Sequence, residues 1–185
     1  MSSPATPIRA AVLTVSDRCS RGAAVDTSGP ALARLLRERL SADVALSRCL
    51  PDEIPQLAAC FREWSRPEAR IDLVISTGGT GLAPRDVTPE AARSVFDREH
   101  SGLMELARMR CYASTPRTYL SRGVAGTIGR TLILTLPGSL RGSTEMLEAL
   151  LDILPHAIET LRGEVQDDGR ADANPATGRV SVHRD

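Results

Sequence analysis

Residues 71–81, with the sequence IDLVISTGGTG, join an apolar, β-branched run to a glycine-rich turn. The run predicts a buried strand at about 72–76. Glycines at the carboxyl end of a strand let backbone N–H groups approach an anion closely, because they have no Cβ. Ligands of open α/β sheets bind at that edge. We therefore expect a phosphate-binding loop at 77–81 with the carboxylate of Asp86 beside it, which indicates nucleotide chemistry with a metal ion.

The rest of the chain alternates apolar runs with segments of helical periodicity. A continuous hydrophobic run predicts a strand buried on both faces, as in parallel sheets, and such a run lies at 10–15; further strands are predicted at 44–50 and 131–136. Residues 124–129 are short and glycine-rich, which indicates a hairpin. Ser28, Thr88 and Ser143 are predicted helix N-caps, and Pro155 is expected to kink or split the last helix before it ends at Gly163.

Strands that alternate with helices imply right-handed βαβ units. The predicted fold class is therefore α/β, a three-layer α/β/α sandwich with a mostly parallel sheet. We expect a single domain over residues 8–163. Residues 164–185 lose the apolar periodicity and predict a disordered tail.

Composition excludes several classes of protein. The chain has 185 residues, of which 42% are hydrophobic, and its 23 basic residues balance 23 acidic ones, so no nucleic-acid partner is expected. Every basic residue is arginine, which excludes a Walker-A P-loop and Schiff-base chemistry, because both need lysine. The loop at 77–81 does not match G-x-G-x-x-G, which argues against a Rossmann dinucleotide site.

The cysteines and the apolar runs bear on localisation. The four cysteines have neither close pairing nor metal-type spacing, so free thiols in a reducing compartment are expected. No run approaches the roughly 18 apolar residues of a membrane span, and residues 1–7 are too short and polar for a signal peptide. We expect a cytoplasmic protein without a membrane partner.

Four carboxylates are predicted to meet at one edge of the sheet. Loops leave the predicted strands at 16–27, 77–86 and 137–141, and the carboxyl ends of parallel strands share an edge. The shared edge brings four aspartates around one glycine-rich pocket: Asp17, Asp26, Asp52 and Asp86. Two structural alternatives stay open: Asp52 is also a good helix N-cap, and Asp86 is also suited to shaping the turn before Thr88.

Taken together, seven segments resemble the molybdopterin adenylyltransferase family, which includes bacterial Mog and MoaB proteins, the plant G domain and the amino-terminal domain of gephyrin. The resemblance covers about residues 9–162. It rests on TVSDR at 14–18, DTSGP at 26–30, LPDE at 50–53, TGGTG at 77–81, PRDVTPEA at 84–91, LSR at 120–122 and LPGS at 136–139.

The resemblance implies a function in molybdenum cofactor biosynthesis, with Mg²⁺-dependent transfer of an adenylyl group from ATP to molybdopterin and release of pyrophosphate. It implies that Asp52 and Asp86 are the catalytic and metal-binding residues. The implied phosphate-binding residues are Thr77, Gly78, Gly79, Thr80 and Gly81. The implied molybdopterin-binding residues are Ser16, Asp17, Asp26, Ser121, Pro137, Gly138 and Ser139. It also implies a homotrimer that hands its product to a molybdate insertase.

Two other functions compete with this interpretation. The main alternative is a non-catalytic, MoaB-like protein that binds molybdopterin or acts as a scaffold. The second is a competence-damage-type domain that hydrolyses other nucleotides without a pterin. ATP turnover measured with and without molybdopterin distinguishes the three.

Overall fold

The computed structural model describes residues 6–164. Its strands are β1 (Arg9–Val15), β2 (Asp43–Leu50), β3 (Leu73–Thr77), β4 (Arg98–Glu99), β5 (Ala125–Ile128) and β6 (Thr131–Leu136). Its α-helices are α1 (Asp17–Ser20), α2 (Ser28–Leu40), α3 (Ile54–Trp64), α4 (Thr88–Arg93), α5 (Ser101–Cys111), α6 (Leu140–Glu148) and α7 (Leu154–Arg162). Two 3₁₀ helices are η1 (Pro67–Ala69) and η2 (Pro116–Leu120).

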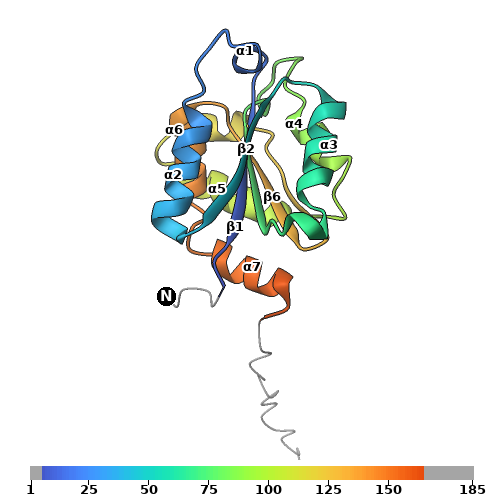
Figure 1. The fold of residues 1–185 in the computed structure, drawn as a ribbon. Coiled ribbons are helices and arrows are strands. Elements are labelled where there is room, and N and C mark those ends of the chain that lie inside the picture. Colours follow the sequence, from blue (N-terminus) through green and yellow to red (C-terminus); the bar gives the residue numbers. More distant parts are fainter. Residues whose placement is uncertain (1–5, 165–185) are drawn as a thin grey trace, which may run out of the picture.

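One mixed sheet runs through the molecule in the order β2-β1-β3-β6-β5-β4. The first four strands of that order are parallel, and the last two pair antiparallel. Helices cover both faces of the sheet, as Figure 1 shows. The predicted three-layer α/β/α sandwich with a mostly parallel sheet is therefore confirmed.

The continuous apolar runs fill both faces of the sheet because successive strand residues point to opposite sides. In β1, Ala10 and Val12 pack in the core beneath α2, α5 and α6, whereas Ala11, Leu13 and Val15 pack in the core beneath α3 and α4. Strands β3 and β6 divide their side chains between the same two cores.

Three predicted N-caps are wrong. Thr27 stands at the N-cap of α2, Val87 at that of α4 and Ser139 at that of α6. Helix α6 therefore begins three residues before Ser143, whose hydroxyl is buried and donates to Leu140 O at 3.1 Å.

Other details of the prediction hold, and besides the two 3₁₀ helices two short elements were missed. The long final helix divides into α6 and α7 before Pro155, and it ends at Gly163 in the left-handed conformation, as predicted. The predicted hairpin is formed by β5 and β6. Helix α1 and strand β4 were not predicted. Apart from Glu164, the predicted tail lies outside the described residues.

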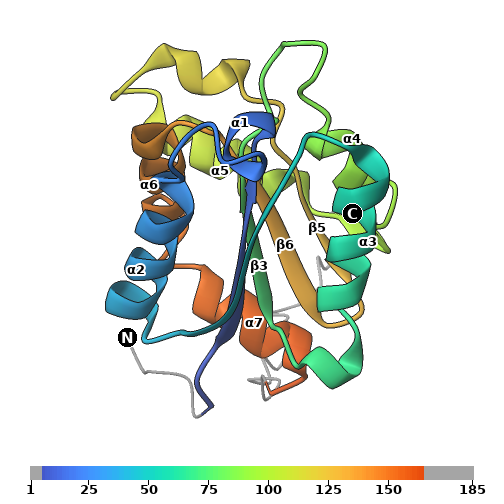
Figure 2. The same ribbon diagram turned by 45° about the horizontal axis from the view of Figure 1, so that its top comes forward.

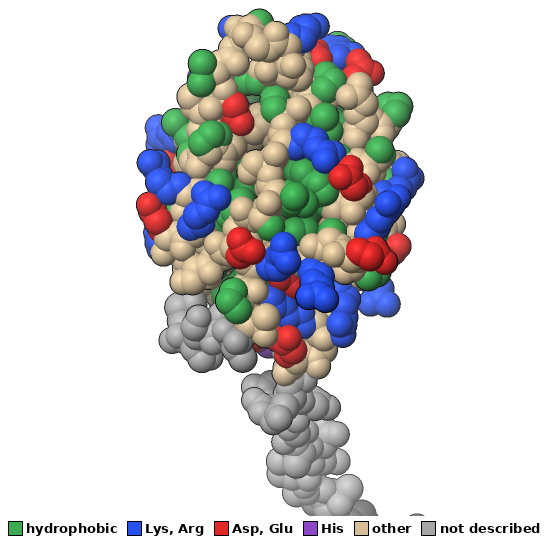
Figure 3. Space-filling model, in the orientation of Figure 1, with side chains coloured by type: hydrophobic (Ala, Val, Ile, Leu, Met, Phe, Trp, Pro, Cys, Tyr) green, Lys and Arg blue, Asp and Glu red, His purple; other side chains and the backbone are tan. Residues whose placement is uncertain are grey.

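Charges of both signs intermix on the face of the molecule shown in Figure 3, in agreement with the balanced composition. Within residues 6–164, no helix combines the length and the hydrophobicity that crossing a membrane requires.

A largely buried ion pair between Arg162 and Asp72 joins α7 to the start of β3. The Arg162 guanidinium binds both oxygens of Asp72, at 2.7 and 3.0 Å, and also donates to the carbonyls of Thr6 and Pro7 at 3.0 Å. The two side chains are 10% and 17% exposed. Asp72 also accepts the backbone N–H of Arg9 at 2.8 Å. This cluster joins both ends of the described chain to the start of β3.

Arg162→Ala is expected to lower the free energy of unfolding by about 3 kcal/mol, because it leaves the Asp72 carboxylate buried without its partner. Urea denaturation followed by circular dichroism measures the change. Arg93→Ala is the control: it breaks an ion pair with Glu99 whose side chains are 50% and 40% exposed, so it should lose less than about 1 kcal/mol. Equal losses in the two variants would contradict a stabilising role for the buried pair.

Candidate functional site

The parallel strands end level with one another, so their loops leave the sheet side by side. Val15 pairs with Leu50, and Thr77 pairs with both Thr14 and Leu136. The register continues one residue further, because Gly78 N donates to Leu136 O at 3.1 Å. Figure 2 brings this edge forward, with α1 and the loop before α4 both lying at it.

The loops approach so closely that one position requires glycine and a second leaves little space for a side chain. Gly78 has φ +105°, and a Cβ there would overlap the carbonyl oxygen of Val15. A Cβ on Gly138 would lie 3.1 Å from the Cα of Gly78. Side chains from the neighbouring segments join the same loops: Thr77 Oγ1 donates to Pro137 O at 2.7 Å, and Ser28 Oγ donates to Gly138 O at 3.0 Å.

Asp52 follows β2 and lies against the glycine-rich loop. Its Oδ2 accepts the backbone N–H of Asp17 at 3.1 Å, and its Oδ1 would lie 2.6 Å from a Cβ on Gly79. Burial, and then the negative charges of Asp17 and Asp86, raise the pKa of Asp52 above its ordinary value of 3.8. The N-cap alternative is wrong, because Glu53 stands at the N-cap of α3 and no side chain caps that helix.

Asp86 closes a short turn with one carboxylate oxygen. Its Oδ2 accepts the backbone N–H of Ala83 at 2.9 Å, and its own N–H donates to Ala83 O at 2.9 Å. The alternative that Asp86 shapes this turn is therefore confirmed. The same Oδ2 would lie 2.8 Å from a Cβ on Gly81. Within residues 6–164, Oδ1 accepts no hydrogen bond, so the carboxylate keeps one oxygen for a ligand.

Asp17 pairs with an arginine instead of lining the predicted pocket. Arg85 donates to both of its carboxylate oxygens, at 2.9 and 3.1 Å, and also to Glu53 at 3.1 Å. The hydrogen bonds from Arg85 hold the pKa of Asp17 below its ordinary range. The prediction that all four aspartates surround one pocket is thus wrong for Asp17, which contacts the site through its backbone bond to Asp52.

Asp26 does line the site, although both of its oxygens are engaged. It accepts the hydroxyl of Thr14 at 2.6 Å and the backbone N–H of Gly29 at 3.0 Å. The second bond caps the start of α2, which is the role that the sequence had suggested for Ser28.

Two adjoining cavities divide the predicted residues between them. The first, which we call the carboxylate cavity, has a volume of about 290 Å³, and its lining includes Ser16, Asp26, Asp52, Thr77, Gly78, Gly79, Asp86 and Gly138. The second, the serine cavity, has a volume of about 400 Å³, and its lining includes Thr80, Gly81, Ser121, Pro137, Gly138 and Ser139. Gly138 belongs to both, and the predicted phosphate loop splits between Gly79 and Thr80.

The serine cavity contains residues that the sequence analysis missed. Arg117 and Thr118 come from η2, and Glu145 comes from α6; the lining also includes Arg141, from the predicted loop at 137–141. The Oγ1 atom of Thr118 is buried and has no hydrogen-bond partner among the described residues. The only sequence signal near η2 was the LSR segment, because a five-residue 3₁₀ helix is too short for a periodic pattern.

No group of three or more His, Cys, Asp or Glu side chains that could hold a metal lies within residues 6–164. The residues that could contribute to a metal site are therefore the pair Asp52 and Asp86. Magnesium is usually bound through one or two carboxylates, with substrate phosphates and waters as the other ligands. The pair fits that pattern, because a cation would also relieve the mutual repulsion that helps to raise the pKa of Asp52.

Comparison with known proteins identifies relatives over most of the chain. The family model described as "Probable molybdopterin binding domain" matches residues 11–156. Molybdenum cofactor synthesis protein cinnamon of Drosophila melanogaster is 39% identical over 83% of the chain, which spans only 26% of cinnamon. Molybdopterin adenylyltransferase of Helicobacter pylori is 36% identical over 84% of this chain and 89% of its own length.

A solved structure gives the same result. The molybdopterin biosynthesis enzyme MoaB of Thermus thermophilus is 48% identical and superposes with a TM-score of 0.79. The superposition covers 84% of this chain and 97% of MoaB.

Gly79→Ala is expected to destabilise the protein more than Gly22→Ala. Both glycines have positive φ, +62° and +71°, so each substitution should lose about 1–2 kcal/mol through backbone conformation alone. Only at Gly79 would the new Cβ also collide with Thr88 and Asp52, because nothing lies within 4 Å of the Cβ position at Gly22. Urea denaturation of both variants measures the difference, and equal losses would contradict tight packing of the carboxylate against the loop.

Asp52→Asn and Asp17→Asn are expected to change stability with opposite signs. The folded-state pKa of Asp52 is raised, so its ionisation weakens folding as pH rises above about 3.8, and the asparagine variant should gain stability relative to wild type toward neutral pH. The pKa of Asp17 is lowered, so its ionised form stabilises the fold at neutral pH.

The Asp17→Asn variant should therefore be less stable than wild type near pH 7, and the deficit should shrink as pH falls below about 3.8. Urea denaturation between about pH 2 and 7, a range that extends well below the ordinary Asp pKa of about 3.9, measures both differences. Parallel pH profiles for the two variants would contradict the assigned environments.

Proposed function

Because the chain belongs to the family of probable molybdopterin binding domains, we propose that it transfers the adenylyl group of ATP to molybdopterin and releases pyrophosphate, a step of molybdenum cofactor biosynthesis. The name of the Helicobacter pylori relative, molybdopterin adenylyltransferase, supports this reaction. The predicted trimer, insertase partner and cytoplasmic location stay predictions from the sequence.

The observation that carries the proposal is the contact of two carboxylates with one glycine-rich loop. Asp52 lies against Gly79 and Asp86 against Gly81. The carboxylates come from two different strand ends, and the loop between them offers backbone N–H groups. A triphosphate that enters the carboxylate cavity would therefore meet dipoles from the loop on one side and the two carboxylates on the other.

The two carboxylates repel a triphosphate unless a cation lies between them. We propose that Asp52 and Asp86 hold Mg²⁺ there, each through the oxygen that is free of protein hydrogen bonds. Bound in this position, Mg²⁺ would neutralise charge on the ATP phosphates during transfer. The Asp52 carboxylate suits the role because it is partly desolvated and already close to another anion.

The chemistry requires positioning more than proton transfer. The attacking group is a terminal phosphate oxygen of molybdopterin, which is already anionic at neutral pH. It forms a bond to the α-phosphorus of ATP while the bond from that phosphorus to the bridging oxygen breaks, and pyrophosphate leaves with the electron pair. The backbone N–H groups of residues 79–81, which donate to no protein acceptor among the described residues, would stabilise the charge on the transferring phosphoryl group. The site therefore needs neither lysine nor histidine.

The serine cavity is the proposed site of molybdopterin. Its volume of about 400 Å³ lies within the usual range for small-molecule sites. Ser121, Ser139 and the unpartnered Thr118 hydroxyl provide polar groups for a pterin ring. Because Gly138 borders both cavities, the phosphate of a ligand in the serine cavity would point toward the carboxylate cavity.

We expect Asp86→Asn to slow adenylylation by about 100-fold or more, because it removes a charged metal ligand where charge develops. The variant should lose less than about 1 kcal/mol of stability, since an amide oxygen can still accept the N–H of Ala83. Asp97→Asn is the matched control, because Asp97 likewise accepts one backbone N–H, from Gly129 at 2.7 Å, but lies at the β4 edge.

The measurement is a single-turnover assay with molybdopterin, α-labelled ATP and Mg²⁺. Label in the pterin product for wild type and Asp97→Asn, but not for Asp86→Asn, supports the proposal. A full rate for Asp86→Asn would refute the role of Asp86. Tight molybdopterin binding without any label would instead favour a non-catalytic binding protein, and turnover without pterin would favour a nucleotide hydrolase.

A further inference from the structure

Asp86 sits in a loop that apolar packing does not hold. Residues 82–85 are exposed, and the side chain of Leu82 is 69% exposed. The turn between Ala83 and Asp86 is closed internally by its two hydrogen bonds. Both bonds belong to an exposed turn, so on their own they hold neither its shape nor its position relative to Asp52. The position of the Asp86 carboxylate must therefore come from contacts at the base of the loop.

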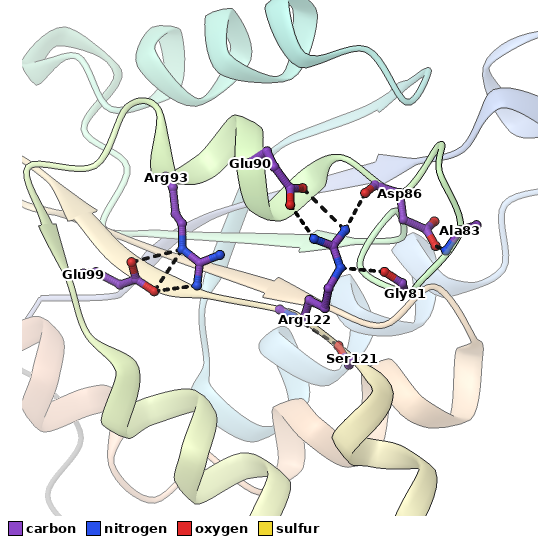
Figure 4. Close-up of polar contacts among 9 residues, drawn as sticks. Gly81, Ala83, Asp86, Glu90, Arg93, Glu99, Ser121 and Arg122 are labelled. Atoms are coloured by element: carbon purple, nitrogen blue, oxygen red, sulfur yellow. Dashed lines mark hydrogen bonds and ion pairs between the residues drawn. The ribbon is translucent and has the colours of Figure 1, made fainter.

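One arginine spans that base. Arg122 Nε donates to Gly81 O at 2.8 Å, and its Nη2 donates to Asp86 O at 2.6 Å, so a single planar guanidinium joins the first and last residues of the loop. The backbone N–H of Arg122 donates to Thr80 O at 2.7 Å. Figure 4 shows the guanidinium between the two ends of the loop, with Glu90 on its far side.

The arginine is itself held from two sides. Glu90, in α4, pairs with Nη1 of Arg122. Arg108, in α5, donates to the carbonyls of Ser121 and Gly123 at 3.2 and 2.6 Å, which fixes the segment that carries Arg122. Ser121 Oγ, in turn, lies 3.1 Å from Thr80 Oγ1.

The other ionic contact of the loop is more exposed. The Arg85 side chain, which pairs with Asp17 and Glu53, is 58% exposed, against 36% for Arg122. Exposed ion pairs add little stability, whereas hydrogen bonds from a charged guanidinium to partly buried carbonyls are stronger. Each of the three nitrogens of the Arg122 guanidinium already donates to a protein oxygen, which favours a role in holding the loop over direct binding of a ligand anion.

We propose that Arg122 is a positioning residue: it fixes the base of the 81–86 loop and thereby places the Asp86 carboxylate for Mg²⁺–ATP binding. The effect of Arg122 on Mg²⁺–ATP binding rests on the proposed function. The fixing of the loop itself is a property of the free protein and is measurable without any ligand.

The test compares Arg122→Gln with the matched control Arg110→Gln. Arg110 also donates to one carbonyl, Ala149 O, and pairs with one carboxylate, Asp152, and its side chain is 38% exposed. Arg110 belongs to α5 and lines neither cavity. The two substitutions remove similar interactions, so a general loss of stability should affect both variants alike.

The first readout is amide hydrogen exchange of Ala83, followed by NMR in the absence of ligand. Exchange should rise about tenfold or more in Arg122→Gln, because the Ala83 N–H is protected only while the turn is held. Arg110→Gln should exchange as wild type does. Unchanged protection of Ala83 in Arg122→Gln would overturn the proposal, whatever the protein's function.

The second readout is the affinity for Mg²⁺–ATP, measured by isothermal titration calorimetry. Arg122→Gln should bind about 10–100-fold more weakly than wild type, as is typical when a residue that orients a metal ligand is lost. Arg110→Gln should bind as wild type does. A loosened loop with unchanged affinity would also overturn the positioning role.

Two milder variants keep the test decisive where Arg122→Gln fails to fold. Arg122→Lys retains the charge but not the planar fork of donors. Compared with Arg122→Gln, it should therefore recover more of the protein's stability than of its affinity for Mg²⁺–ATP. Glu90→Gln removes the ion pair with Arg122 but leaves the bonds of Arg122 to both loop carbonyls in place. It should therefore raise Ala83 exchange and weaken Mg²⁺–ATP binding, each by less than Arg122→Gln does. Wild type that does not bind Mg²⁺–ATP at all would refute the proposed function, and the Ala83 exchange would then still report separately on whether Arg122 holds the loop.

Discussion

The structure depends on the contact of three loops through their backbones at Gly78. At this residue the loop after β3 touches the carbonyl of Val15 on one side and Gly138 on the other, with no space for a Cβ. Because the loops are so close, Asp52 from the end of β2 reaches Gly79, and the loop after Gly81 folds back to bring Asp86 beside it. Larger residues at Gly78 or Gly138 would separate the loops and pull apart the two carboxylates and the two cavities.

Hydroxyl groups make this close contact stable. Thr77, Ser28 and Thr88 each donate to a carbonyl of a neighbouring loop, at Pro137, Gly138 and Gly78 respectively. Buried carbonyls at a loop junction need a donor, and these small side chains provide one without adding charge near the carboxylates. The site thus gains no charge beyond its aspartates, and the raised pKa of Asp52 reflects the energetic penalty of burying a carboxylate near other negative charges.

The sequence predicted the parts of the molecule that local patterns determine. The buried parallel strands β1, β3 and β6 and the split of the last helix follow from hydrophobic continuity and from Pro155. The placement of Asp52 and Asp86 at one edge follows from parallel topology. The N-caps were wrong because residue type alone cannot show that the hydroxyl of Ser28 has a partner 110 residues away. The pairing of Asp17 with Arg85, 68 residues apart, was invisible for the same reason. The four-residue α1 and the two-residue β4 are too short for any period to be recognised.

The shared wall at Gly138 has a consequence for turnover. Each cavity, taken alone, offers a limited set of contacts to the molecule that occupies it. A product made by joining the two occupants would keep both sets of contacts. On binding it would lose the translational and rotational freedom of only one molecule, so it would be held more tightly than either precursor. The same geometry that favours joining the two molecules therefore opposes release of the joined product, and departure of the product, rather than bond formation, would limit the rate of successive cycles.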